Sequence, residues 1–142
     1  MSLTDMAAWE KENPNVLPPK DRHEADPNGI ASGTPGAKLD AGKAPVTQGV
    51  IQYFPRALRA VAMLSAYGAE KYSWKGWESV PDGVNRYGDA MGRHMLDAAT
   101  DGMWDDGPGG SGALHDTSIA WNALAKLELV IRELEAGDDS PA

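Results

Sequence analysis

The sequence contains no cysteine, so the chain has no disulfide, no thiolate zinc site and no thiol nucleophile. Long hydrophobic runs are also missing, since no stretch approaches the ~20 apolar residues that a membrane span needs. The N-terminus lacks the basic-then-apolar pattern of a secretion signal. We therefore expect a cytoplasmic protein that has no membrane partner.

Basic residues are scarce relative to acidic ones. The sequence has 13 Lys and Arg against 21 Asp and Glu, which gives a formal net charge of -8. Binding a polynucleotide backbone normally requires a basic face, so nucleic acid is not an expected partner. A small polyphosphate remains compatible, because carboxylates can hold a divalent metal while a few Lys and Arg contact the phosphates.

The 142 residues fit one main domain with flanking segments. Residues 1–36 are rich in Pro and Gly, show no helical period and are predicted to form an irregular arm. Trp9 and the pair Val16-Leu17 are its sizeable apolar anchors, so we expect the arm to wrap over the core or a neighbouring subunit. Residues 37–136 form the predicted domain, and residues 137–142 form an acidic tail.

Apolar residues at intervals of three and four predict three helices, over about residues 54–72, 84–103 and 113–136. Pro55 suits the first turn of the first helix, and Gly137 is expected to stop the third. The fold class is therefore all-α. Because helices of this size make a thin core, we predict that identical subunits complete the bundle as a homodimer or tetramer.

The second helix carries His94, Asp97 and Asp101 at spacings of three and four, which place them on one stripe. Two carboxylates at this spacing repel each other, and a divalent cation between them turns the repulsion into binding. A solvated acidic face has the same pattern, and on this helix alone the two interpretations are equally open.

Two further acids come from the other helices. Asp116 shares a stripe with Ala120, Ala123 and Leu127, so we expect it to face inward. A buried carboxylate needs a metal, a basic residue or the free amides of the helix N-terminus as its partner. Glu70 closes the first helix, where an exposed, unpaired Glu is the alternative. The predicted metal ligands are Glu70, His94, Asp97, Asp101 and Asp116, and the predicted catalytic acids are Glu70, Asp97 and Asp116.

If the small polyphosphate is a nucleotide, aromatic, basic and amide side chains are available to contact it. Trp74 and Trp77 suit base stacking, although each indole suits a plug of the core equally well. Asn122 can offer a donor and an acceptor to a purine edge, and His115 is either a metal ligand or a donor behind one. The basic residues expected at the phosphates are Lys38, Lys43, Lys71 and Arg93.

Several segments together resemble one phage family. These are Gly36 to Lys43, Tyr67 to Tyr72 with Trp77, Arg93-His94, Ser111 to His115 and Ala120 to Leu124. In this order they are similar to the dATP/dGTP diphosphohydrolases, which are grouped with MazG-like all-α nucleotide pyrophosphohydrolases. The similarity extends from about Gly36 to Leu134 and is closest to the MazZ-type members found beside phage genes for 2-aminoadenine synthesis.

The resemblance implies hydrolysis of a deoxypurine triphosphate, dGTP before dATP, to the monophosphate and pyrophosphate. It also implies Mg²⁺ or Mn²⁺, a homo-oligomer with sites shared between subunits, and a role in 2-aminoadenine DNA precursor synthesis in the host cytoplasm. The chain departs from the family pattern at Tyr67 and His94, where relatives pair acids, at Gly109-Gly110, where they have a Glu, and at Ser118, where they have a His. Asp105 and Asp106 are therefore alternative ligands.

Two other functions fit the sequence. His94 and His115-Asp116 resemble an HD-type phosphohydrolase, which would release nucleoside and triphosphate, but that class needs more helices and an Asp well downstream. The chain could also be a non-enzymatic helical oligomer that binds a nucleotide or a host protein, with the acids on solvated faces.

Overall fold

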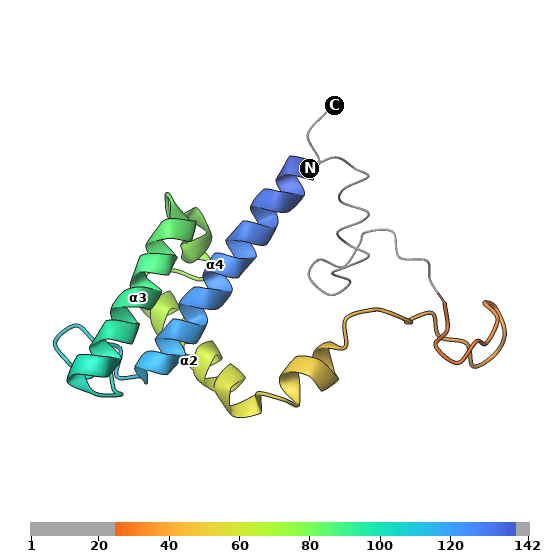
Figure 1. Ribbon diagram of the computed structural model, residues 1–142, viewed down its shortest axis with the longest axis horizontal. Helices are drawn as coiled ribbons and strands as arrows, with labels where there is room; N and C mark the ends of the chain where they lie inside the picture. The colour runs from red at the N-terminus through yellow and green to blue at the C-terminus, as the bar shows by residue number, and fades with distance from the viewer. Residues whose placement is uncertain (1–24, 139–142) are drawn as a thin grey trace. The chain divides into compact units, whose positions relative to one another are not determined.

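The computed structural model describes residues 25–138 in two compact units, residues 1–52 and 53–142, each considered by itself. The described part of the first unit contains turns and the π-helix η1 (Thr47–Ile51). The second contains α2 (Pro55–Lys71), the 3₁₀ helix η2 (Gly76–Ser79), α3 (Gly83–Asp101) and α4 (His115–Asp138) (Figure 1). Residues 25–138 form no strand beyond an isolated bridge between Trp104 and Leu114, so the all-α class is confirmed.

Local chemistry explains where the helices begin and end. Pro55 occupies the first turn of α2, where its missing N–H costs nothing. Gly102 ends α3 at a φ of 102°, which favours glycine because it has no Cβ. All three predicted helices exist within two residues of their expected ends, but the predicted stop at Gly137 is wrong. The helix continues through this glycine to Asp138, since one Gly costs a helix only about 1 kcal/mol.

The core lies where α4 packs against α3 over a broad contact and against α2 over a smaller one. Ala125 is the one apolar residue buried among residues 25–138. The other buried positions of α4 are polar: His115, Thr117, Ser118 and Asn122. Few apolar side chains are thus withdrawn from water within the described single chain, and the inner face of α4 is mainly hydrogen-bonding.

The predicted inward stripe of α4 is therefore wrong. Asp116, Ala123 and Leu127 are exposed, whereas Ser118, Asn122 and Ala125 are buried. Both faces of this helix carry residues at intervals of three and four, so periodicity alone could not show which one packs on α3.

The first unit is organised around Asp26, which is 9% exposed. Its two carboxylate oxygens accept the backbone N–H groups of Asn28 and Lys38, each at 2.7 Å, and Ala41 N–H donates to the Ala25 carbonyl at 3.0 Å. These bonds close residues 25–41 into a loop. The domain boundary expected at residue 36 stays a prediction, and the proposed anchors Trp9, Val16 and Leu17 lie outside the described residues.

None of the helices within residues 25–138 has the length and apolar character required to cross a membrane.

Candidate active site

A pocket of about 1230 Å³ opens on the second unit. Its walls come from the end of α2, the loop that follows it, the middle of α3, the loop between α3 and α4, and the first turns of α4. The volume exceeds the roughly 300–1,000 Å³ of typical small-molecule sites, so a nucleotide fits. Segments distant in sequence thus surround one space.

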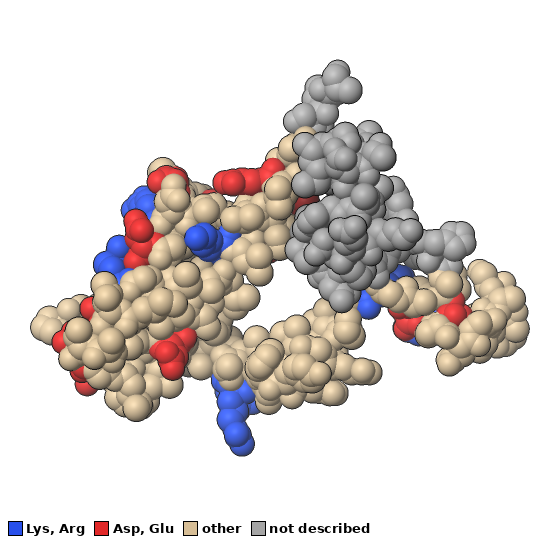
Figure 2. All heavy atoms as spheres, in the orientation of Figure 1, with Lys and Arg blue, Asp and Glu red and all other residues tan. Residues whose placement is uncertain are grey.

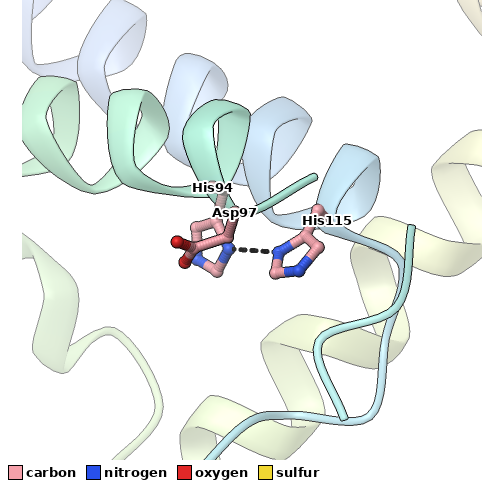
Figure 3. A group of neighbouring side chains, drawn as sticks. All are labelled: His94, Asp97 and His115. Carbon is pink, nitrogen blue, oxygen red and sulfur yellow. Dashed lines mark hydrogen bonds between the residues drawn. The ribbon is translucent and has the colours of Figure 1, made fainter. Parts of the chain in front are cut away.

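Three side chains could hold a metal ion, and one of them, His94, lines this pocket. His94 and Asp97 come from α3, His115 comes from the start of α4, and their ligand atoms all lie within 4.8 Å of one another (Figure 3). The spacing of three along α3 puts His94 and Asp97 on the same side of the helix. His115 is 3% exposed, His94 is half-buried and Asp97 is exposed. The trio combines two imidazoles with one carboxylate.

The two imidazoles meet through their Nδ1 atoms, 3.0 Å apart. At this distance one Nδ1–H can donate to the other Nδ1, with roles that depend on the tautomers, or both lone pairs can point at one metal ion. Two nitrogen ligands at ~2.1 Å from one ion lie about 3.0–3.4 Å apart, so the observed separation fits a shared ion. The donor set therefore suits a divalent metal.

The carboxylate of Asp105 lines the pocket itself. Asp105 follows α3 and is half-buried. Its Oδ2 accepts two hydrogen bonds from Ser111, one from the backbone N–H at 3.0 Å and one from the side-chain Oγ–H at 3.2 Å. These hydrogen bonds, the backbone one first, lower the pKa of Asp105 below its ordinary value, with smaller contributions from His94 and His115. The neighbouring acid Asp106 is exposed and does not line the pocket.

An aromatic cluster forms another wall. The rings of Trp77, Tyr87 and Trp121 meet edge to face, with centroids 5.7–6.3 Å apart. Trp121 Nε1–H donates to Ser65 Oγ at 2.9 Å, and Tyr87 Oη–H donates to the Trp77 carbonyl at 2.7 Å. Desolvation in this cluster raises the pKa of Tyr87. Trp77 is therefore a packed wall residue, whereas Trp74, 71% exposed, lies at the rim.

Asn122 is buried in the pocket wall, at 8% exposure. Its Nδ2 donates to the Ser118 carbonyl at 2.7 Å. Because a carbonyl only accepts, this bond fixes which end of the amide is nitrogen. Oδ1 accepts no hydrogen bond from the described residues. Every fully buried side-chain N or O atom of the described residues has a hydrogen-bond partner, so Oδ1 is not one of these fully buried atoms. Oδ1 is therefore accessible as an acceptor, and the Ser118 carbonyl uses one of the two N–H groups of Nδ2.

Basic side chains also line the pocket. Lys71 and Arg93 were expected there, and the structure adds Lys75 and Arg86. Lys75 adopts a left-handed backbone conformation with a φ of 60°, and no motif in the sequence predicted this conformation. Lys38 and Lys43 belong to the first unit. On the face drawn in Figure 2, Lys and Arg side chains are interspersed with acidic and uncharged residues over the helices.

The remaining predicted ligands do not join the metal group of the described residues. Glu70, Asp101 and Asp116 are all exposed, and none lines the pocket. Of the predicted metal set, the structure brings together His94 and Asp97. It adds His115, which had been placed among the nucleotide contacts with a metal role left open.

Packed helices, a pocket of nucleotide size and a set of metal-type donors define an all-α domain with a candidate metal-dependent site. A family model described as dATP/dGTP diphosphohydrolase, N-terminal, matches residues 33–139. This match spans more than half of the chain, and the protein belongs to that family. The description names a diphosphohydrolase acting on deoxypurine triphosphates. Comparisons with curated proteins and with solved structures gave no match.

Proposed function

We propose that this protein hydrolyses a deoxypurine nucleoside triphosphate, dGTP in preference to dATP, to the monophosphate and pyrophosphate. One observation carries the proposal: His94, a member of the metal group, lines the same pocket as four basic side chains and the acceptor of Asn122. Phosphate, metal and base could thus be bound within one space. Family membership supports the substrate class.

In the proposed reaction a water molecule attacks the α-phosphorus, and the bond from this phosphorus to the oxygen bridging to the β-phosphorus breaks. The oxygen of that bond leaves with pyrophosphate, and the water's oxygen stays on the monophosphate. A bound divalent ion would neutralise phosphate charge and lower the pKa of the attacking water. Lys71, Lys75, Arg86 and Arg93 would bind the phosphate oxygens.

Asp97 is the acid that we assign to the metal, with His94 and His115. Two imidazole donors suit Mn²⁺ better than Mg²⁺, which favours an all-oxygen set. Mn²⁺ is therefore the favoured ion of the two. Glu70, Asp101 and Asp116 stay predicted site residues. A neighbouring subunit could bring such exposed acids to a shared site, as the family resemblance implies.

The acceptor of Asn122 supports a preference for guanine. A purine 2-amino group is a hydrogen-bond donor that guanine has and adenine lacks, and Oδ1 is a fixed acceptor in the pocket wall. Trp74 at the rim would stack on the base. The resemblance to MazZ-type proteins supports a role in supplying dGMP for 2-aminoadenine nucleotide synthesis, in a phage-infected host cytoplasm.

A product assay tests the proposal. Each of the four deoxynucleoside triphosphates is incubated with the full-length protein and Mn²⁺, then with Mg²⁺, and the products are separated. We expect dGMP and pyrophosphate from dGTP, and slower turnover of dATP. Deoxyguanosine with triphosphate would support the HD-type alternative. Absence of turnover with every substrate would support a binding protein instead.

Substitutions test the metal assignment. Asp97→Ala should lower kcat/KM for dGTP at least ~100-fold with Mn²⁺ present, because the ion loses its carboxylate. Asp101→Ala, one turn further along α3, should cost less than ~3-fold if the described group is the ligand set. Glu135→Ala, an exposed acid near the end of α4, controls for loss of surface charge. Full turnover by Asp97→Ala would contradict the assignment.

A further inference from the structure

The loop between α3 and α4 holds Asp105 through its backbone as well as its side chain. Asp105 N–H donates to the Ala113 carbonyl, and Gly112 N–H donates to the Asp105 carbonyl, both at 2.8 Å. The bridge between Trp104 and Leu114 closes the loop immediately outside these bonds. The backbone of Asp105 is thus held from both sides, which limits the directions open to its side chain.

The carboxylate itself is fixed through one oxygen and open at the other. Ser111 provides both donors to Oδ2, while Oδ1 accepts no hydrogen bond within residues 25–138. Ser111 Oγ in turn accepts the N–H of Ala113 at 3.2 Å, so the serine is also held in place. Two donors on one oxygen favour the ionised carboxylate and leave Oδ1 as an unused acceptor.

Gly110 keeps space free beside this oxygen. A Cβ at position 110 would lie 2.7 Å from Asp105 Oδ1 and would overlap the Asp105 carbonyl. Any side chain there would therefore displace Asp105. The loop in its present form requires glycine at this position, so position 110 cannot carry the acid expected from the family resemblance without rearrangement.

The metal group has room for another negative charge. With neutral rings, His94, Asp97 and His115 offer a single negative charge to a divalent cation, and ligand charge is one of the factors that set affinity. Asp105 lines the same pocket as His94. A carboxylate at this position would balance the remaining positive charge of the ion.

We propose that Asp105 is the second carboxylate of the metal site, and that its negative charge strengthens the binding of a divalent transition-metal ion that His94, Asp97 and His115 would hold directly. Its oxygens lie outside the group whose ligand atoms are within 4.8 Å of one another, so it acts from the outer edge of the site. The inference rests on the metal dependence in the proposed function and not on hydrolysis. It also separates Asp105 from Asp106, which the sequence left as equal alternatives.

Binding of Mn²⁺ alone to the full-length protein tests this role. Mn²⁺ is titrated into the wild type, Asp105→Asn and Asp106→Asn, with free ion followed by electron paramagnetic resonance. Asp105→Asn keeps the shape and an acceptor for Ser111 but loses the charge, so its Kd should rise at least ~10-fold. Asp106→Asn removes the same charge one residue away, on an exposed side chain, and should change Kd less than ~2-fold.

A further variant guards against loss of the fold. Ser111→Ala removes one of the two donors to Asp105 and keeps the backbone donor, so Kd should rise by about 2–5-fold at an unchanged melting temperature. Equal Kd values for the wild type, Asp105→Asn and Ser111→Ala would overturn the inference, as would absence of Mn²⁺ binding by the wild type. Mn²⁺ binding that depends on Asp105, without turnover of any triphosphate, would support the inference and contradict the proposed function.

Discussion

Asn122 shows how one hydrogen bond changes the chemistry of a residue. From the sequence, its amide could present a donor and an acceptor to a purine. In the structure the Ser118 carbonyl, one turn back along α4, accepts one N–H of Nδ2 and so fixes Oδ1 as the acceptor end of the amide. Helical spacing makes a bond from residue 122 to the carbonyl of residue 118 geometrically available, but whether the side chain adopts it depends on the packing around it.

This acceptor leads to a prediction about the base. The 2′-deoxyinosine triphosphate lacks the 2-amino group of dGTP, so the wild type should prefer dGTP in kcat/KM by about 5-fold, the equivalent of roughly 1 kcal/mol. In Asn122→Ala the ratio of kcat/KM for dGTP to kcat/KM for 2′-deoxyinosine triphosphate should fall to near one. Steady-state kinetics with both substrates measures it. Asn85→Ala, an exposed asparagine of α3, serves as the control. An unchanged preference in Asn122→Ala would show that another group reads the base.

His115 could not be assigned from the sequence, because its partners lie on another helix. His94 and Asp97 are three residues apart, and that spacing alone places them on one side of α3. His115 meets them through the packing of α4 on α3, with its Nδ1 atom 3.0 Å from that of His94. Asp116, the adjacent residue, is exposed. Adjacent positions of a helix point in different directions, so His115 is a buried candidate ligand while Asp116 faces solvent.

At the level of elements, α4 illustrates the limit of periodicity. Its length and position were predicted, but its inner face was not, because apolar residues lie on more than one side. The buried side consists of polar residues and Ala125, and the exposed side includes Leu124, Leu127 and Leu134. Such an arrangement is unusual for a monomer, where large apolar residues normally provide the core.

The loop of residues 25–41 gives a prediction with a defined pH dependence. The backbone N–H of Lys38, and secondarily those of Asn28 and Ile30, lower the pKa of Asp26 below its ordinary value. With an unfolded pKa near ~3.9, its stabilising contribution is complete above that pH and is lost as pH falls through the lower folded pKa. Amide hydrogen exchange of Lys38, measured by NMR between about pH 2 and 6 and corrected for intrinsic rates, should show protection falling on the acid side.

The control for this loop is Asp26→Asn, which keeps one acceptor oxygen and cannot ionise. In that variant the protection of Lys38 should be low and free of the acid transition. Protection that falls equally in the wild type and in the variant would assign the acid effect to another group.

At the scale of the whole molecule, the described chain leaves many large apolar side chains exposed. Leu124 and Leu127 of α4 are 49% and 54% exposed, and Met63 of α2 is 66% exposed. Association of identical subunits is a common way to cover large apolar side chains that a single chain leaves exposed. We therefore propose that α4 contributes to a subunit interface of a homodimer or tetramer.

Sedimentation measurements test the interface. The wild type should sediment as a dimer or tetramer, and the double variant Leu124→Lys with Leu127→Lys should sediment as a monomer, since two charges cannot be buried there without partners. Both positions are exposed in the single chain, so its helix content, followed by circular dichroism, should stay the same. A monomeric wild type would contradict the proposal, and an unchanged oligomer in the variant would place the interface elsewhere.

Much of the architecture follows from local chemistry that can be read along the chain. The helices α2, α3 and α4 were predictable because their apolar residues recur at intervals of three and four and Pro55 suits a first turn, and such signals act within a few residues of one another. The pairing of His94 with Asp97 has the same origin. The packing of α4 was decided only in three dimensions, because several of its faces satisfy the same period. This packing places His115 beside His94, leaves Asp116 in solvent and fixes the orientation of the Asn122 amide. The loop geometry that distinguishes Asp105 from Asp106 likewise depends on contacts that local sequence does not encode.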